Sequence, residues 1–166
     1  MFDLNAIQSA LRELGFDAWL FYDFRGSNAL ARSILKLEGG MNSRRFLYLV
    51  QNNGVAMRYG IGVGRDGFQW NGLLRVTRKS EWPDWTPPPE MIKRQPYLPR
   101  FMAGGPGNPM GARALYLGQT IYRIHGTNAP HTIGHAVSSG CFRLVNSEIE
   151  DLYGRVAVGA KVIVQQ

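Results

Sequence analysis

The spacing of hydrophobic residues changes along the chain and predicts two parts with different secondary structure. Within the first forty residues, Ile7, Leu11 and Leu14 recur at the spacing of one helix face. A short apolar run at 18–22 predicts a buried strand, and the helical spacing returns over 30–37. This segment therefore predicts a helix–strand–helix unit with too little apolar surface to be stable alone.

From Arg44 onward the pattern becomes typical of strands. FLYLV (46–50) and VAMRY (55–59) flank Asn53-Gly54, a dipeptide that supplies the positive φ angles of a tight hairpin turn. The later segments ARALYL, IYRIHG and AKVIVQQ are also predicted to be strands. Between the last two, VNSEIEDLYGRV predicts a short helix, because acids stand in its first turn and Asn146 or Ser147 is available as N-cap.

Residues 81–110 differ from both parts, because they hold eight of the nine prolines and two of the four tryptophans. Proline at this density argues against a regular helix or a central strand, so a long loop is expected. One interpretation is a surface connector. The other is an aromatic-lined flap over a site, because long ordered loops in compact domains are often functional.

The composition limits the class of protein. A chain of 166 residues suits one domain with a small appendage, and a single cysteine excludes an internal disulfide. No apolar run reaches the length of a membrane span, and the N-terminus lacks the pattern of a secretory signal. The net charge of +7 comes from scattered basic residues. Scattered charge favours weak attraction to polyanions such as a carboxylate-rich cell wall, and we expect no nucleic-acid binding.

The reactive side chains gather in one segment, which suggests a cysteine nucleophile. Cys141 follows Ser138-Ser139-Gly140, a polar turn whose backbone amides could bind a developing oxyanion. His125 ends a predicted strand and could serve as the base that such a thiol needs. The alternative is that Cys141 is a small buried hydrophobic residue, which is the commoner role of a lone cysteine.

A zinc site is the rival interpretation of the remaining histidines. His131 and His135 have the i, i+4 spacing of two ligands on a helix, with Cys141 beyond them. Pro130 and Gly134 argue against a helix there, and no fourth ligand is evident. We therefore expect no metal, and two solvent-exposed loop histidines.

These residues carry a resemblance to a known family. RIHGTNAPHTIGHAVSSGCFRLVNSEIEDLYGRVAVGAKVIV resembles the signature region of the L,D-transpeptidase (YkuD-like) catalytic domain, and the likeness runs from about Arg44 to the C-terminus. In that family a His-Gly/Ser pair precedes a Ser/Thr-His-Gly-Cys block followed by an apolar residue and Arg or Asn. Here Ser139 stands where the commonest form of the motif has histidine.

The resemblance implies roles for seven residues. Cys141 would be the nucleophile, His125 the general base and acid that keeps the thiol ionised, and the backbone carbonyl of Gly126 the group that orients His125. The amides of Gly140 and Cys141 would form the oxyanion hole. Ser138, Ser139 and Arg143 would bind substrate or brace the site.

The N-terminal stretch carries a second resemblance. DAWLFYDFRGSNALARSIL is similar to the opening of the creatinase-like N-terminal domain of Xaa-Pro peptidases, without the metal-binding peptidase domain that should follow. We therefore expect a fragment over 1–40 fused to a catalytic domain over 41–166, with the joint near Arg44-Arg45. The expected fold is mainly β: a mixed sheet or sandwich of the L,D-transpeptidase type, a short helix after the cysteine, and a small N-terminal α/β appendage.

The implied function is peptidoglycan cross-linking. The thiol would form a thioester with a stem tetrapeptide, release D-Ala, and pass the acyl group to a diamino-acid side-chain amine. No cofactor is expected, carbapenems are the expected inhibitors, and the periplasm or cell envelope is the expected location. Two alternatives remain open: a cysteine amidase or carboxypeptidase acting on similar peptides, and a catalytically impaired peptidoglycan-binding domain.

Overall fold

The computed structural model describes residues 9, 13, 45–51 and 55–165. The expected fragment over 1–40, apart from two helical positions, and the Asn53-Gly54 turn lie outside the described residues. The fusion with a creatinase-like fragment therefore stays a prediction.

The first two strands form the expected hairpin. β1 (Arg45–Val50) pairs antiparallel with β2 (Ala56–Ile61), in a register that sets Leu47 opposite Tyr59. Alternation along each strand turns one face inward, where Leu47, Leu49 and Tyr59 are buried. The hairpin therefore closes one side of the core.

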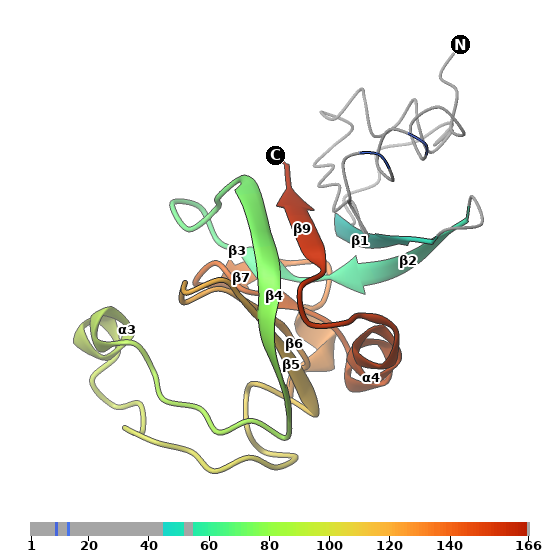
Figure 1. Ribbon diagram of the computed structural model, residues 1–166. Helices are drawn as coiled ribbons and strands as arrows, with labels where there is room; N and C mark the ends of the chain where they lie inside the picture. Colours follow the sequence, from blue (N-terminus) through green and yellow to red (C-terminus); the bar gives the residue numbers. More distant parts are fainter. Residues whose placement is uncertain (1–8, 10–12, 14–44, 52–54, 166) are drawn as a thin grey trace.

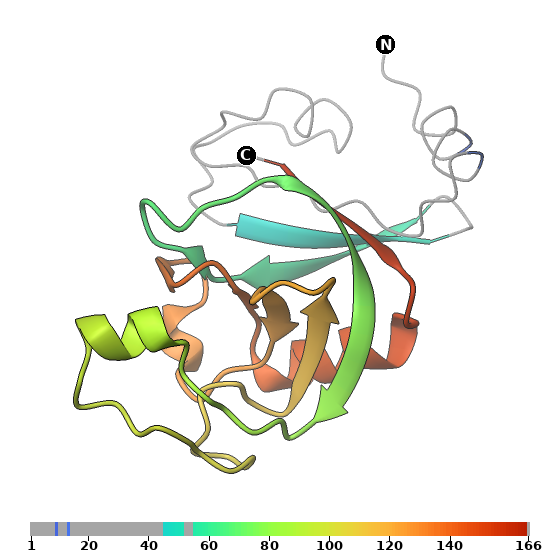
Figure 2. The same cartoon turned by 60° about the vertical axis from the view of Figure 1, so that its left-hand side comes forward.

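A mixed sheet forms the centre of the described part of the chain. Its strand order is β8-β6-β5-β4-β9, and only the β6–β8 pair is parallel. The five strands are β4 (Gly72–Glu81), β5 (Arg113–Leu117), β6 (Arg123–His125), β8 (Phe142–Arg143) and β9 (Lys161–Val164). Figures 1 and 2 show the long β4 curving across the molecule. The expected mainly-β fold is confirmed.

β4 joins two halves of this sheet. Its first four residues pair with β9, and its later residues, from Val76, pair with β5. The register shifts between Val76 and Arg78, so the strand bends where it changes partner. Nearby, the short β3 (Val63–Gly64) runs parallel to β7 (Ala136–Ser138).

One helix covers the core from the side. α4 (Asn146–Arg155) buries Ile149 and Leu152 against it, and both side chains are almost completely inaccessible. The helix was expected here, but the expected cap is wrong: Val145 is the N-cap, without a side-chain hydrogen bond. The Asn146 side chain instead accepts hydrogen bonds at 3.1 Å from the amides of Ala112 and Thr127.

The proline-rich segment is ordered and contains a helix, which corrects the expectation of a loop without one. α3 spans Pro89–Arg94, with Pro89 in the first turn, where no backbone donor is needed. Around it, Trp85 and Met102 exchange two backbone hydrogen bonds of 2.8 Å. The almost fully buried Asn108 donates to the carbonyls at 102 and 103. Figure 2 shows this flap, residues 81–110, across the central strands from α4.

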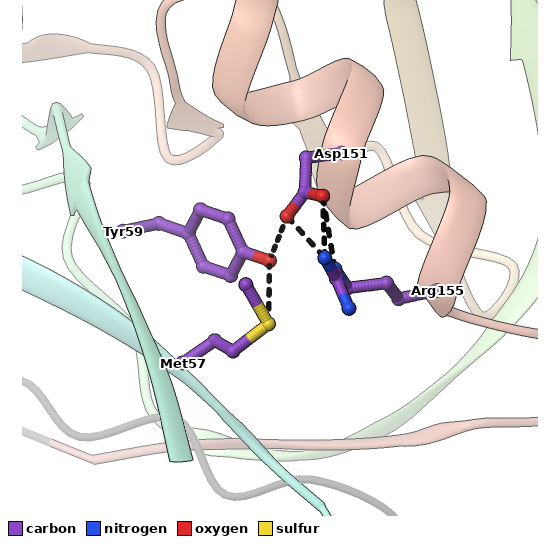
Figure 3. A network of polar contacts seen from close by, with 4 residues as sticks. All are labelled: Met57, Tyr59, Asp151 and Arg155. Carbon is purple, nitrogen blue, oxygen red and sulfur yellow. Dashed lines mark hydrogen bonds and ion pairs between the residues drawn. The ribbon is translucent and has the colours of Figure 1, made fainter.

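A polar network ties the hairpin to α4 (Figure 3). The buried Tyr59 donates its hydroxyl hydrogen to Asp151 at 2.6 Å, and Arg155 donates to the same carboxylate at 2.9 Å. Arg155, followed by Tyr59, holds the pKa of Asp151 below its ordinary value. The folded protein therefore binds a proton at Asp151 less readily than the unfolded chain does.

This network predicts a pH-dependent contribution to stability. A lowered folded-state pKa stabilises the fold above the unfolded value, about 3.9, and the gain is lost as pH falls through the folded value. Asp151→Asn should therefore lower the melting temperature at pH 6, and the difference from the parent should close toward pH 3. Thermal unfolding across this range measures it, with Glu150→Gln on the same helix as the matched control. A difference that stays constant with pH would contradict the role of the charge.

Candidate active site

The parallel pairing of β6 with β8 brings the candidate residues to one face of the sheet. The register sets Ile124 opposite Phe142 and His125 opposite Arg143. Paired residues of parallel strands share a face, and successive residues along a strand point to opposite faces. Because Ile124 and Phe142 are buried in the core, the opposite face carries His125, Arg143 and their neighbours Arg123 and Cys141.

This face lines a cleft of about 570 Å³. The flap forms the opposite wall, which includes Trp85, Met91 of α3, and Met110. Trp82, in contrast, is exposed outside the cleft lining. The structure therefore favours the interpretation of residues 81–110 as a flap over a site.

His125 is held by the backbone of the next residue. Its ring is buried, and Nδ1 lies 2.7 Å from the carbonyl oxygen of Gly126. A carbonyl only accepts hydrogen bonds, so Nδ1 carries the hydrogen and Nε2 has the free lone pair. Burial lowers the pKa of His125 to about 4, helped by the charges of Arg143 and Arg123 and opposed by the carbonyls of Gly126 and Met110.

Cys141 lies in the same cleft, with its sulfur 3.7 Å from the carbonyl oxygen of Ile121. Burial raises the pKa of the thiol, although the neighbouring Arg123 and Arg143 oppose the shift. Burial thus disfavours both the thiolate and the imidazolium. The pKa shifts therefore favour a neutral thiol and a neutral imidazole in the free protein at neutral pH.

The turn before Cys141 is braced by a serine and a glycine. The Ser138 hydroxyl donates to the Cys141 carbonyl at 2.7 Å and accepts from the Gly140 amide at 3.2 Å. Gly140 has a φ of 107°, and a Cβ there would lie 2.6 Å from the Tyr122 ring. Only glycine suits this position. The Gly140 amide is thus engaged, whereas the Cys141 amide has no partner in the described part of the chain.

Four arginines line the cleft, Arg65, Arg94, Arg123 and Arg143, and two of them carry unpaired donors. Nε and one terminal nitrogen of Arg143, and Nε of Arg123, are buried without a hydrogen-bond partner among the described residues. Glu90 is the one carboxylate among the described residues that line the cleft, and it is paired with Lys93 at 2.8 Å. Unpaired guanidinium donors favour an anionic group such as a carboxylate.

Most of the sequence matches the model of one family. The model of the YkuD family, the L,D-transpeptidase catalytic domain, matches residues 41–164. The chain belongs to this family.

Two relatives in Escherichia coli agree with the assignment. The "Probable L,D-transpeptidase ErfK/SrfK" is 44% identical over 125 residues, which cover 72% of this chain and 40% of the relative. The "Probable L,D-transpeptidase YbiS" is 40% identical over 125 residues, with 71% and 40% covered. The chain therefore spans about 40% of the length of these relatives.

Solved L,D-transpeptidase structures share the fold. L,D-transpeptidase 3 from Mycobacterium tuberculosis superposes with a TM-score of 0.58 at 17% identity, covering 73% of this chain and 57% of that one. The catalytic domain of the E. faecium L,D-transpeptidase, acylated by ertapenem, gives 0.53 at 19% identity, with 75% and 90% covered. At these identities the likeness supports the L,D-transpeptidase fold alone.

The other two histidines lie apart from the cleft lining. His131, in the 3-10 turn Pro130–Thr132, and His135 are both exposed. Among the described residues, no group of three or more His, Cys, Asp or Glu side chains could hold a metal ion. No helix within the described ranges is long and apolar enough to cross a membrane.

Sequence reasoning missed three residues that shape the site. Arg123 stands two positions before His125, and this period of two in a strand was the available signal. Trp70 donates its indole hydrogen to the Gly140 carbonyl at 2.8 Å. Asn146 holds the amide of Thr127, next to the carbonyl that contacts His125. The contacts of Trp70 and Asn146 had no local sequence signal.

The neutral resting pair predicts the pH dependence of thiol reactivity. Alkylation needs the thiolate, and a raised thiol pKa places ionisation above the ordinary value of about 8.5. The rate constant with iodoacetamide should therefore rise roughly tenfold per pH unit from pH 6 to 8. Intact-mass measurement is specific because Cys141 is the only cysteine of the chain. A flat rate between pH 5 and 8 would instead show a thiolate–imidazolium pair.

Proposed function

We propose that residues 41–166 are the catalytic domain of a peptidoglycan L,D-transpeptidase. The observation that supports the proposal is the placement, in one cleft, of a thiol and a buried histidine whose Nδ1 is fixed by the Gly126 carbonyl. This leaves Nε2 free to take a proton, and no carboxylate among the described residues is bonded to the ring. Because the substrate is part of the wall, we infer that the domain acts in the cell envelope.

The first half-reaction transfers an acyl group to sulfur. His125 accepts the Cys141 proton as the sulfur attacks the carbonyl between the third residue of a stem tetrapeptide and its terminal D-Ala. The Cys141 amide donates to the oxyanion that forms. The C–N bond then breaks, His125 returns the proton to the leaving amine, and a thioester remains with free D-Ala.

The second half-reaction restores the thiol. A diamino-acid side-chain amine of another stem peptide attacks the thioester and loses a proton to His125. The C–S bond breaks, and the sulfur recovers the proton. Water in place of the amine would give hydrolysis. A neutral resting pair suits this cycle, because charge separates only when a substrate carbonyl is present to receive the electron pair.

Arg143 and Arg123 would bind a substrate carboxylate. Their buried, unpaired donors lie beside the thiol, and the nearest candidate on a tetrapeptide is the carboxylate of the terminal D-Ala. The basic cleft also suits the other carboxylates of stem peptides. Ser139 also lines the cleft, and we propose it as a substrate contact.

The function is tested with a stem tetrapeptide and mass spectrometry. We expect D-Ala release and a cross-linked dimer from the parent protein, and neither from Cys141→Ala. A tetrapeptide ending in D-alaninamide should react more slowly, because it lacks the terminal carboxylate. Tripeptide without dimer at any acceptor concentration would show a carboxypeptidase. If the parent protein forms no product although iodoacetamide still alkylates its thiol, the chain is a catalytically impaired binding domain.

A carbapenem provides a second test of the same chemistry. Among the structures that share the fold, one is an L,D-transpeptidase complex with imipenem and one carries a faropenem-derived adduct. We expect this chain to gain the mass of one carbapenem at Cys141 and Cys141→Ala to gain none.

The histidine has its own prediction. His125→Ala should slow carbapenem acylation at pH 7 by roughly 10²–10⁴-fold, the usual scale of general-base assistance. Much of the loss should return above about pH 8.5, where hydroxide ionises the thiol. His131→Ala and His135→Ala are matched controls, because both side chains are exposed, and they should keep the parent rate. Equal losses in all three variants would refute the pairing.

A further inference from the structure

The peptide bond between Gly140 and Cys141 is held by a tryptophan from a distant segment. Trp70 Nε1 donates to the Gly140 carbonyl oxygen at 2.8 Å. The indole stacks on Tyr122, with ring centroids 4.4 Å apart and planes 11° apart, and tilts against Phe142 at 5.6 Å. Two aromatic neighbours thus restrict the indole, and its single donor is directed at one backbone oxygen.

This hydrogen bond sets the direction of the Cys141 amide. The carbonyl and the N–H of a trans peptide point in opposite directions. Gly140 and Trp70 line a small cavity on one side of the turn, whereas Cys141 lines the large cleft. With the Gly140 carbonyl bonded to Trp70, the Cys141 N–H points away from the indole, and it donates to no group in the described part of the chain.

The turn needs such an anchor because of its glycine. Glycine populates positive and negative φ angles almost equally, so a peptide plane next to Gly140 could reorient at low cost. Ser138 holds the Gly140 amide and the Cys141 carbonyl, but neither of these groups belongs to the peptide bond between the two residues. Of the hydrogen bonds among the described residues, the one from Trp70 acts on that peptide directly.

We propose that Trp70 is a positioning residue that directs the Cys141 amide at the oxyanion of the acyl-transfer reaction. The inference rests on the proposed function, since it needs a tetrahedral intermediate. Trp70 itself does not line the cleft that contains Cys141. It acts through one backbone peptide, so its loss should affect steps that form an oxyanion and leave other reactions of the thiol unchanged.

Two reactions of the same sulfur separate these effects. Acylation by a carbapenem passes through an oxyanion, whereas alkylation by iodoacetamide displaces iodide at a CH₂ group and forms none. Trp70→Phe removes the N–H donor, and replacement of Trp70 by 3-benzothienylalanine removes it with almost no change in ring shape. Trp82→Phe, in the exposed part of the flap, is the matched control. Intact-mass kinetics give both rate constants for each protein.

We expect acylation to fall on the order of 10–100-fold in both Trp70 variants, below the 10²–10³-fold typical of a fully deleted oxyanion donor. Alkylation at pH 8 should stay within about twofold, and Trp82→Phe should keep both parent rates. An unchanged acylation rate in the benzothienylalanine protein would overturn the inference, because shape and not the hydrogen bond would then matter. Parallel losses of acylation and alkylation would also overturn it, by showing that the thiol had moved.

Failure of the role of Trp70 can be distinguished from failure of the proposed function. A parent protein that is alkylated but never acylated would contradict the function, and with it the inference. A parent that is acylated at the same rate as the Trp70 variants would leave the function intact and remove only the role of Trp70.

Discussion

The site depends on the pairing of two very short strands. β6 has three residues and β8 has two, yet their parallel register sorts the side chains into a buried face and a reactive face. The buried face belongs to the main core through Ile124 and Phe142. Arg143 adds two backbone hydrogen bonds to Gly62, which secure the second strand from its other side. The packing of the core therefore fixes the thiol, the imidazole and both arginines together.

Burial then determines the electrostatics of the cleft. The histidine and the thiol both lose solvent, and burial opposes the charged form of each. A carboxylate beside the imidazole would favour its charged form, but here a neutral carbonyl takes that place. Among the described residues of the cleft lining, arginines supply the positive charge, and the unpaired donors of Arg123 and Arg143 stay available for an incoming anion. Burial therefore favours the neutral form of both groups, and the positive charge of the cleft stays on the arginines.

Much of the fold was predictable because it follows local patterns. The hairpin, β5, β6, β9 and α4 all have the spacing of their class, and each forms where expected. β4 was missed because it is largely exposed, lacks regular alternation and changes partner halfway along. α3 was missed because the density of proline over 81–110 was taken to argue against a helix, although a first-turn proline such as Pro89 loses no hydrogen bond.

The site likewise contains residues that could be predicted from the sequence and residues that could not. Cys141, His125 and Gly126 could be named from a motif, because their contacts lie close in sequence or follow from a family pattern. The Trp70 contact to Gly140 joins residues 70 positions apart, and Asn146 left its expected capping role for two distant amides. The neutral state of the thiol and imidazole follows from burial, which a sequence does not specify residue by residue.

The backbone hydrogen bonds at the base of the flap have a consequence for how this domain could diversify. Trp82 bonds to the backbone at Ala112, and Trp85 bonds to Met102, so both ends of the flap are tied to the body or to each other. The segment 86–101, which contains α3, forms a loop closed at its base by the Trp85–Met102 pair. Insertions or exchanges within this loop would leave the base, the sheet and the turn at Cys141 intact. The segment is therefore a replaceable module through which related enzymes could acquire new donor or acceptor preferences while keeping one chemistry.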